Sequence, residues 1–404
     1  MWQPPERTAA ASAAIAAADQ GRLARPDRYL LDADHLASVA ARRDGNTERF
    51  AAGWREGLER YVESASEDGR LNAFGTAMAA RTAVSRLRSG VALSRFREAN
   101  PNVADRPPTP PIFITGGWRS GTTFLFRLLA SDPHLRAPLP AELAEPMSMA
   151  SLSGEERERR IDASAAAHDM LHALNPTLRA IHDSGARLPE ECGLAMGADL
   201  RSWSLSATTR LESYSEWLAG QDLGPSYRDY ASVLGVLGDG DDRRWVLKAP
   251  PHLAELGALA QAFPGAVVVI LHRDIVETIA SGASLFAVFR STYSDDVDPR
   301  DVGRFQSDQT ELWMRRAHEF RTSALASTIT MLDVDYGDLV SDPAGTLDRV
   351  YAAADREPPA DLEAFVADFN AAHPRHAQGT HRYSPEDFGL NPAELRERFA
   401  EFAR

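Results

Sequence analysis

The sequence predicts an α/β fold of the P-loop type, with a central, mostly parallel sheet between two layers of helices and an N-terminal helical extension. Two observations lead to this fold class. After residue 106, short apolar runs typical of strands alternate with longer helical segments, which is the pattern of a parallel sheet covered on both faces. The first 105 residues are instead rich in Ala, Leu, Arg and Glu, which favours helices.

A proline-rich stretch separates these two parts of the chain. Residues 100–111 (NPNVADRPPTPP) cannot continue a helix, because proline lacks an amide donor and disfavours α geometry in the residue before it. The sequence therefore predicts a helical N-terminal extension over residues 1–105 and one catalytic domain over residues 106–404.

Four strand-containing units follow in order. The run IFIT at residues 112–115 precedes a glycine-bearing loop and the helical FLFRLLAS, and the run WVL at residues 245–247 precedes HLAELGALAQAF. The third unit is VVVIL with the helical IVETIASGASLF, and TITMLDVDYGDLV supplies the fourth strand. Because parallel sheets of this kind bind ligands at the carboxyl ends of their strands, a site is expected in the loops that follow them.

Composition and charge narrow the function classes. The formal net charge of −14 over 404 residues argues against a general nucleic-acid binder, which needs excess Lys and Arg. The longest strongly apolar run, residues 266–271, is far shorter than the roughly 20 residues of a membrane span, and the amino terminus lacks the features of a secretion signal. The single Cys192 excludes an internal disulfide and a Cys-based metal cluster. We therefore expect a cytoplasmic enzyme with no membrane partner; the oligomeric state stays open.

Residues 116–123 (GGWRSGTT) have the spacing of a phosphate loop between a strand and a helix. Glycines let backbone amides turn inward, and the amino terminus of the next helix adds the positive end of its dipole, so an anion is stabilised there. A nucleotide triphosphatase would carry lysine after the second glycine, whereas Thr122 occupies that position. The loop thus predicts a site for one terminal phosphate-like group, formed by Gly117, Trp118, Arg119, Ser120, Gly121, Thr122 and Thr123.

With this loop, the sequence resembles the family of sulfotransferases that use 3′-phosphoadenosine 5′-phosphosulfate (PAPS), in particular its bacterial branch. That branch usually has Pro-Arg-Ser-Gly-Thr-Thr, and Trp118 replaces the proline here. The loop, the Lys248 segment, the HRD segment and a terminal HRYS segment appear in the expected order. The resemblance implies a sulfotransferase domain that moves a sulfuryl group from PAPS, as co-substrate and without a metal, to a hydroxyl or amine of a small-molecule acceptor.

Further residues are assigned to the donor. Arg273 stands where a buried strand ends, and a cation in that position is placed to hold an anion. The resemblance assigns Arg273 and Ser281, eight residues later, to the 3′-phosphate of PAPS. It also implies that the segment at residues 381–384 closes over the nucleotide, with Arg382 and Tyr383 as its contacts.

Sulfuryl transfer requires in-line placement, neutralisation of the departing phosphate oxygen and a base for the incoming nucleophile. Lys248, at the end of the strand WVLK, is the candidate for charge on the bridging oxygen. His252 lies at the start of the next helix, whose amino terminus favours a neutral imidazole, and we expect it to act as the base. Glu142 is the alternative, as a base or as a group that orients the acceptor.

His182 and Glu191 resemble family residues near the acceptor pocket, and we expect both to contact the acceptor. Two other functions remain open at this stage. A P-loop kinase that uses ATP shares the fold, and fold alone does not decide function; Thr122 in place of lysine speaks against it. A noncatalytic nucleotide-binding protein would keep the anion site without the chemistry. The acceptor itself is not predicted, because loops shape such pockets.

Overall fold

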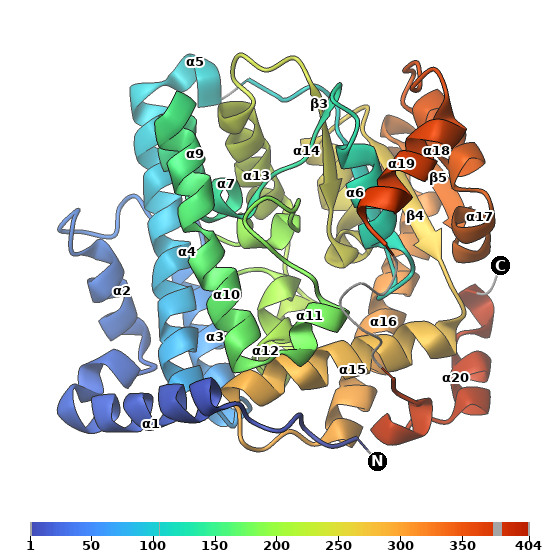
Figure 1. Ribbon diagram of the computed structural model, residues 1–404. Helices are drawn as coiled ribbons and strands as arrows, with labels where there is room; N and C mark the ends of the chain where they lie inside the picture. Colours follow the sequence, from blue (N-terminus) through green and yellow to red (C-terminus); the bar gives the residue numbers. More distant parts are fainter. Residues whose placement is uncertain (1, 105, 375–381, 403–404) are drawn as a thin grey trace.

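A computed structural model describes residues 2–104, 106–374 and 382–402 of the chain. At its centre lies a five-stranded parallel sheet with the order β2-β3-β1-β4-β5 (Figure 1). The predicted parallel sheet is confirmed, and the four predicted strands are β1, β3, β4 and β5. The strands are β1 (Ile112–Gly116), β2 (Leu135–Arg136), β3 (Arg244–Lys248), β4 (Val267–His272) and β5 (Thr330–Asp335).

The edge strand β2 has no counterpart among the predicted strands. Its two residues pair with β3, Leu135 beside Arg244 and Arg136 beside Trp245. A strand of two residues is too short to show an alternation of apolar and polar positions. Its presence therefore cannot be predicted from the sequence pattern.

Helices cover both faces of the sheet, as the sequence predicts. Ile112 and Ile114 of β1 belong to one buried cluster, whereas Phe113 between them belongs to the other, because successive side chains of a strand point to opposite faces. The first cluster is completed by α6 (Thr122–Ala130), α17 (Tyr336–Ser341), α18 (Pro343–Ala353) and α19 (Leu362–Ala372). The second includes η4 (Pro250–Glu255), α13 (Gly224–Leu237), α14 (Leu256–Ala262), α15 (Ile275–Tyr293) and α16 (Pro299–Arg321).

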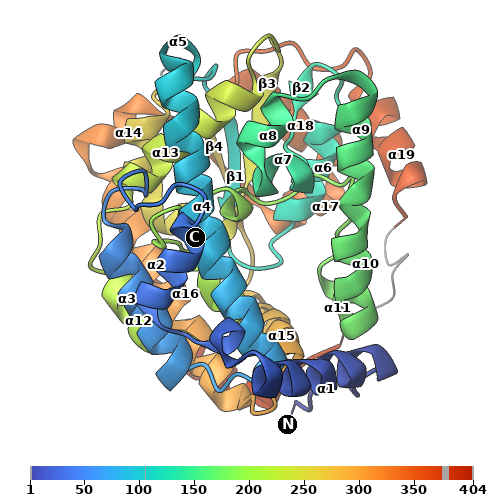
Figure 2. The same ribbon diagram turned by 90° about the vertical axis from the view of Figure 1, so that its left-hand side faces the viewer.

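In the described part of the chain, the segment before β1 is helical, as predicted. Leu58 and Leu87 from this segment share a buried cluster with Phe113 of the sheet, so the N-terminal helices pack on the same core. Figure 2 shows α1 lying against one end of the long α4. The domain boundary at residue 105 stays a prediction. The elements are α1 (Ala9–Ala24), η1 (Pro26–Tyr29), α2 (Ala33–Ala41), α3 (Trp54–Glu67), α4 (Ala73–Ala99) and α5 (Pro101–Ala104).

Most of the other helices lie in the long connection between β2 and β3. These are α7 (Pro140–Ala144), α8 (Pro146–Ala150), α9 (Gly154–Ala163), α10 (Ala165–Leu174), α11 (Thr177–Ile181), η2 (Cys192–Leu194), η3 (Trp203–Ala207) and α12 (Glu212–Leu218). Later in the chain come η5 (Ala324–Thr328), η6 (Pro385–Phe388), α20 (Pro392–Arg398) and η7 (Ala400–Phe402).

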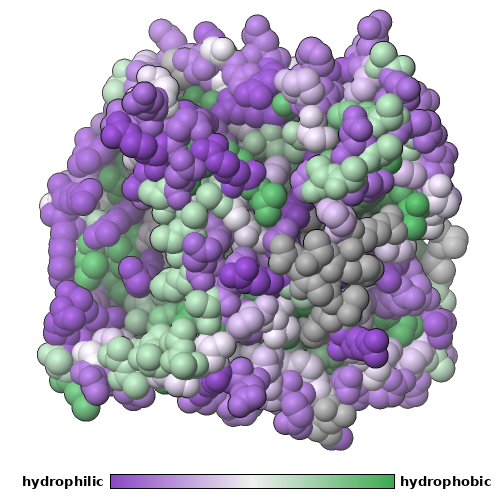
Figure 3. All heavy atoms as spheres, in the orientation of Figure 1, coloured by the Kyte–Doolittle hydropathy of each residue, from purple (hydrophilic) through white to green (hydrophobic). Residues whose placement is uncertain are grey.

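The face drawn in Figure 3 is mostly hydrophilic, with pale green side chains over α1. The exposed positions of α1 are largely alanine. Among the described residues, no helix combines the length and the apolar character that crossing a membrane requires.

Candidate functional site

The glycine loop lies at the carboxyl end of β1, the central strand of the sheet, and leads directly into α6. Gly116 has φ of 141°, and a Cβ added there would lie 2.4 Å from the carbonyl oxygen of Leu271 in β4. Gly121, which precedes α6, has φ of 93°. Both glycines have backbone conformations that residues with a side chain rarely adopt. The path of the loop therefore depends on glycine at these two positions.

Hydrogen bonds between residues close in the sequence hold the turn of the loop together. The amide and the hydroxyl of Ser120 both donate to the carbonyl of Gly117, at 3.3 and 2.7 Å. Thr115, before the loop, donates its hydroxyl to the carbonyls of Ala249 and Pro250. Because Thr122 and Thr123 begin α6, their amides lie in its first turn, where a helix stabilises anions.

Arg119 occupies the tip of this loop in a left-handed conformation, with φ of 59°. Its side chain, expected to help form the anion site, donates to the carbonyl of Ile181 at 2.9 Å, where α11 ends. Arg119 thus ties the loop to α11.

Trp118, in the place of the family's proline, is 9% exposed. Its ring lies 5.0 Å from Phe286 and 5.9 Å from Trp313. A Cβ added at Gly282 of α15 would approach the Trp118 ring to 2.6 Å. The indole therefore packs against α15 and α16 and stiffens the loop by packing, where a proline would restrict the backbone.

Arg273 follows β4 and contacts the loop. Its Nη1 donates to the carbonyl of Arg119 at 2.8 Å, and its Nη2 forms an ion pair with Glu277. The guanidinium lies 4.5 Å from the ring centroid of Tyr336. Ser281, the other residue expected at the 3′-phosphate, is 3% exposed on α15.

Lys248 ends β3 and is 4% exposed. Its Nζ lies 3.3 Å from the hydroxyl of Thr123 and forms an ion pair with Glu191. Lys248 and Arg273 therefore approach the same loop from the two strands that flank β1.

A second ionic pair lies next to Lys248. The Nε2 of His182 is 3.8 Å from the Oε2 of Glu190. Burial opposes protonation of His182, but the nearby carboxylates of Glu190 and Glu191 raise its pKa. Burial also opposes ionisation of Glu190, yet the nearby imidazole of His182 lowers the pKa of Glu190 to about 2. His182, Glu190 and Glu191 thus form two ionic pairs in the same region as Lys248. Contact of His182 and Glu191 with an acceptor stays a prediction.

His252, expected to act as the base, lies in the core of the protein and is 1% exposed. The Tyr227 hydroxyl is 2.7 Å from its Nδ1, and its ring meets Phe113 edge-on at 5.1 Å. Burial lowers the pKa of His252 to about 3. The imidazole is therefore kept neutral by its burial, and its role as a base stays a prediction.

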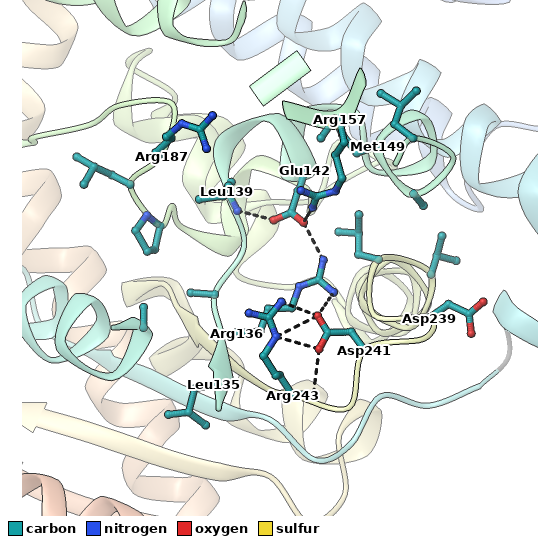
Figure 4. Close-up of a pocket in the computed structure, with 18 of the residues that line it drawn as sticks. Leu135, Arg136, Leu139, Glu142, Met149, Arg157, Arg187, Asp239, Asp241 and Arg243 are labelled. Carbon is teal, nitrogen blue, oxygen red and sulfur yellow. Dashed lines mark hydrogen bonds and ion pairs between the residues drawn. The ribbon is translucent and has the colours of Figure 1, made fainter. Parts of the chain in front are cut away.

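Glu142, the alternative base, is 2% exposed in the first turn of α7. Its Oε2 accepts from the amide of Leu139 at 2.8 Å, and its Oε1 accepts from Arg136 at 2.8 Å and from Arg157. Figure 4 shows these contacts at the wall of a cavity of about 750 Å³. Both carboxylate oxygens are thus engaged: Glu142 caps α7 at the Leu139 amide and links β2 to α9 through Arg136 and Arg157.

The terminal segment is described only in part. Arg382 is exposed and Tyr383 is partly buried against the larger core, whereas His381 lies outside the described residues. The closing role expected for this segment stays a prediction.

Comparison with known proteins gives a consistent result. A family model described as the sulfotransferase family matches residues 110–359. The omega-hydroxy-beta-dihydromenaquinone-9 sulfotransferases Stf3 of Mycobacterium bovis and Mycobacterium tuberculosis are each 24% identical over 253 residues, or 60% of this chain. The chain spans 62% of the length of these curated relatives.

Solved structures extend the likeness over most of the chain. Sulfotransferase STF1 of Mycobacterium tuberculosis H37Rv superposes with a TM-score of 0.76 at 28% identity, covering 91% of this chain and 98% of its own. Sulfotransferase STF9 of Mycobacterium avium gives a TM-score of 0.78 at 24% identity, with 92% and 96% covered. Because its sequence identity is only 24%, the likeness to STF9 shows a shared fold and nothing more.

Proposed function

The chain belongs to the sulfotransferase family, and from that premise we propose that it transfers a sulfuryl group from PAPS to a hydroxyl or amine of a small-molecule acceptor. The observation that carries the proposal is the placement of two cations, Lys248 and Arg273, on either side of one glycine loop. A donor with separate 5′ and 3′ anions requires two such positions. No lysine follows the loop's second glycine, where a triphosphate would need one.

The residues around the loop fit this donor. The amides in the first turn of α6 and the ammonium of Lys248 suit the 5′-phosphosulfate. The guanidinium of Arg273 suits the 3′-phosphate, because it can form two parallel hydrogen bonds with phosphate oxygens. Ser281, on the α15 that follows Arg273, is the expected hydroxyl partner. PAPS binding is thus supported by the kinds of donors gathered here and by family membership.

Lys248 is proposed to stabilise the transition state. When bound, the donor supplies an activated sulfuryl group whose bond to the bridging phosphate oxygen breaks as the bond to the acceptor forms. The ammonium of Lys248 lies in a water-poor environment, at 4% exposure, where a positive charge stabilises a developing negative charge strongly. It therefore suits the bridging oxygen better than a surface lysine would.

The base that we propose is Glu191, in place of the expected His252 and Glu142. The Glu191 carboxylate already contacts the Nζ of Lys248 and is 25% exposed, so it is accessible to an acceptor. When the ammonium turns toward the bridging oxygen, it leaves the carboxylate free to accept the proton of the incoming hydroxyl or amine. Burial of His252 and the three donors on Glu142 argue against those two residues.

A hydroxyl is the acceptor group that we would test first. The names of the two curated relatives specify omega-hydroxy-beta-dihydromenaquinone-9. We include hydroxylated menaquinones among the acceptors to be tested. The cytoplasmic location expected from the sequence stays a prediction.

The direct test is to incubate the protein with radiolabelled PAPS and a panel of alcohols, phenols, amines and hydroxylated quinones. We expect one class of acceptor to become sulfated, and Lys248→Ala to abolish labelling while the protein stays folded. A parallel incubation with labelled ATP and Mg²⁺ tests the kinase. Transfer of phosphate from ATP, or nucleotide binding with no sulfated product across the panel, would contradict the proposal.

A further inference from the structure

The ion pair of Arg273 and Glu277 is positioned where it can affect donor binding. Arg273 follows β4, and Glu277 lies one helical turn further on, in the first turn of α15. The Nη2 of Arg273 contacts the Oε2 of Glu277, while its Nη1 donates to the loop carbonyl of Arg119. Its Nε is buried and has no hydrogen-bond partner among the described residues. The guanidinium thus retains unused donor capacity but carries a carboxylate on one edge.

This pair lines a cavity of about 670 Å³ at the carboxyl ends of β4 and β5. A volume of this order suits a small-molecule ligand, since such pockets commonly measure about 300–1,000 Å³. Tyr336 supplies an aromatic wall beneath the Arg273 guanidinium. On another side, the cavity is bounded by Arg396 of α20, by Phe402 of η7 and by Phe399 between these two helices.

The other charged side chains around this cavity do not pair with Arg273 in the described structure. Asp274 caps α15, because its Oδ1 accepts from the amides of Val276 and Glu277 at 3.0 and 3.1 Å. Arg396 lies 3.6 Å from the Oδ2 of Asp274, and Asp335 also lines the cavity. The carboxylate of Glu277 has no capping role in the described structure. Its contact is with Arg273, which also touches the glycine loop.

We propose that Glu277 is a positioning residue that competes with the 3′-phosphate of the donor for Arg273. This inference rests on the proposed function, since it assumes a nucleotide with a 3′-phosphate. Without ligand, Glu277 and the Arg119 carbonyl hold the guanidinium beside the loop. A 3′-phosphate must displace or crowd the carboxylate, and the negative charge left nearby then weakens its attraction to Arg273. Glu277 therefore sets how tightly the 3′-phosphorylated product is retained after transfer.

The test compares binding of adenosine 3′,5′-bisphosphate and of 5′-AMP, which lacks the 3′-phosphate, by titration calorimetry at low salt. We expect Glu277→Gln to bind the bisphosphate about 3- to 10-fold more tightly than the wild type, as suits the loss of one partly exposed competing charge. Its affinity for 5′-AMP should not change. The gain should shrink at high salt and be largely lost when Arg273→Ala is added, because the carboxylate acts through that guanidinium.

A matched control is Glu59→Gln, which breaks the exposed ion pair of Arg55 and Glu59 with the same four-residue spacing on α3. It should leave both affinities unchanged. If Glu277→Gln binds the bisphosphate no more tightly than the wild type, this inference is overturned and the proposed function is not. If Glu277→Gln does not fold, Glu277→Ala serves for the same measurement. A wild-type protein that does not bind the bisphosphate at all overturns the proposed function, and this inference with it.

Discussion

At the scale of single residues, two cations beside the loop are each paired with a carboxylate. Lys248 ends β3 and contacts Glu191; Arg273 follows β4 and contacts Glu277. Neutralising a buried or half-buried charge in this way avoids the cost of leaving it unpaired. It also means that an anionic ligand must exchange partners with a carboxylate to bind. In the proposed mechanism this exchange at Lys248 is useful, because it frees Glu191 only once the donor is in place.

Glu191→Gln tests the proposed base. The amide cannot accept the acceptor's proton, so we expect kcat to fall by about 10²- to 10⁴-fold, the usual contribution of a general base. Affinity for adenosine 3′,5′-bisphosphate should stay the same or increase, because Lys248 loses a competing carboxylate. Steady-state kinetics and calorimetry measure the two effects. The control is Glu158→Gln, which breaks an exposed pair with Arg187; full kcat in Glu191→Gln would exclude Glu191 as the base.

His252→Gln separates a structural role from a catalytic one. Burial lowers the pKa of His252 from 6.5 to about 3, so below pH 6.5 the unfolded chain takes up a proton that the folded protein excludes. This residue's contribution to stability is therefore complete above pH 6.5 and declines as the pH falls toward 3. Urea unfolding should show a pH dependence between 6.5 and 3 that is steeper in the wild type, by up to about 1.4 kcal/mol per pH unit.

The same variant should keep kcat within about tenfold of the wild type in its folded fraction, since a general base is worth at least about 10²-fold. A collapse of kcat with unchanged stability would instead restore His252 as the base.

At the scale of elements, β1, the loop and α6 form one unit whose geometry depends on Gly116. We expect Gly116→Ala to destabilise the protein by roughly 2 kcal/mol or more, since the conformation is strained for alanine and the methyl group would meet Leu271. Gly257→Ala in α14 is the control, because a Cβ there meets nothing within 4 Å. That change should stabilise the helix by roughly 0.5–1 kcal/mol. Equal effects of the two substitutions on urea unfolding would contradict this view of the loop.

At the scale of the whole molecule, the sheet and the position of the site were predictable because both follow from local patterns. The apolar run before Gly116, and those ending in Lys248 and at Arg273, predict strands. Parallel strands bring their carboxyl ends to one edge. The two cations were therefore expected near the loop, and the structure places both in contact with it.

Other features depend on contacts between distant segments and left no local signal. The bond from Arg119 to the carbonyl of Ile181 joins residues 62 positions apart. The burial of His252 is produced by Tyr227 and Phe113, which lie on other elements. The pair of Arg273 and Glu277 is different, because its partners lie four residues apart in the sequence, on either side of the α15 N-cap residue Asp274.

The most direct measurement for the central claim is calorimetric titration of the wild-type protein with adenosine 3′,5′-bisphosphate and, separately, with ATP and Mg²⁺. The two-cation site predicts tighter binding of the bisphosphate, and Arg273→Ala should weaken that binding by about 1.5–3 kcal/mol, the scale of a charged hydrogen bond. Preference for ATP, or bisphosphate binding that is indifferent to loss of the guanidinium, would contradict the account.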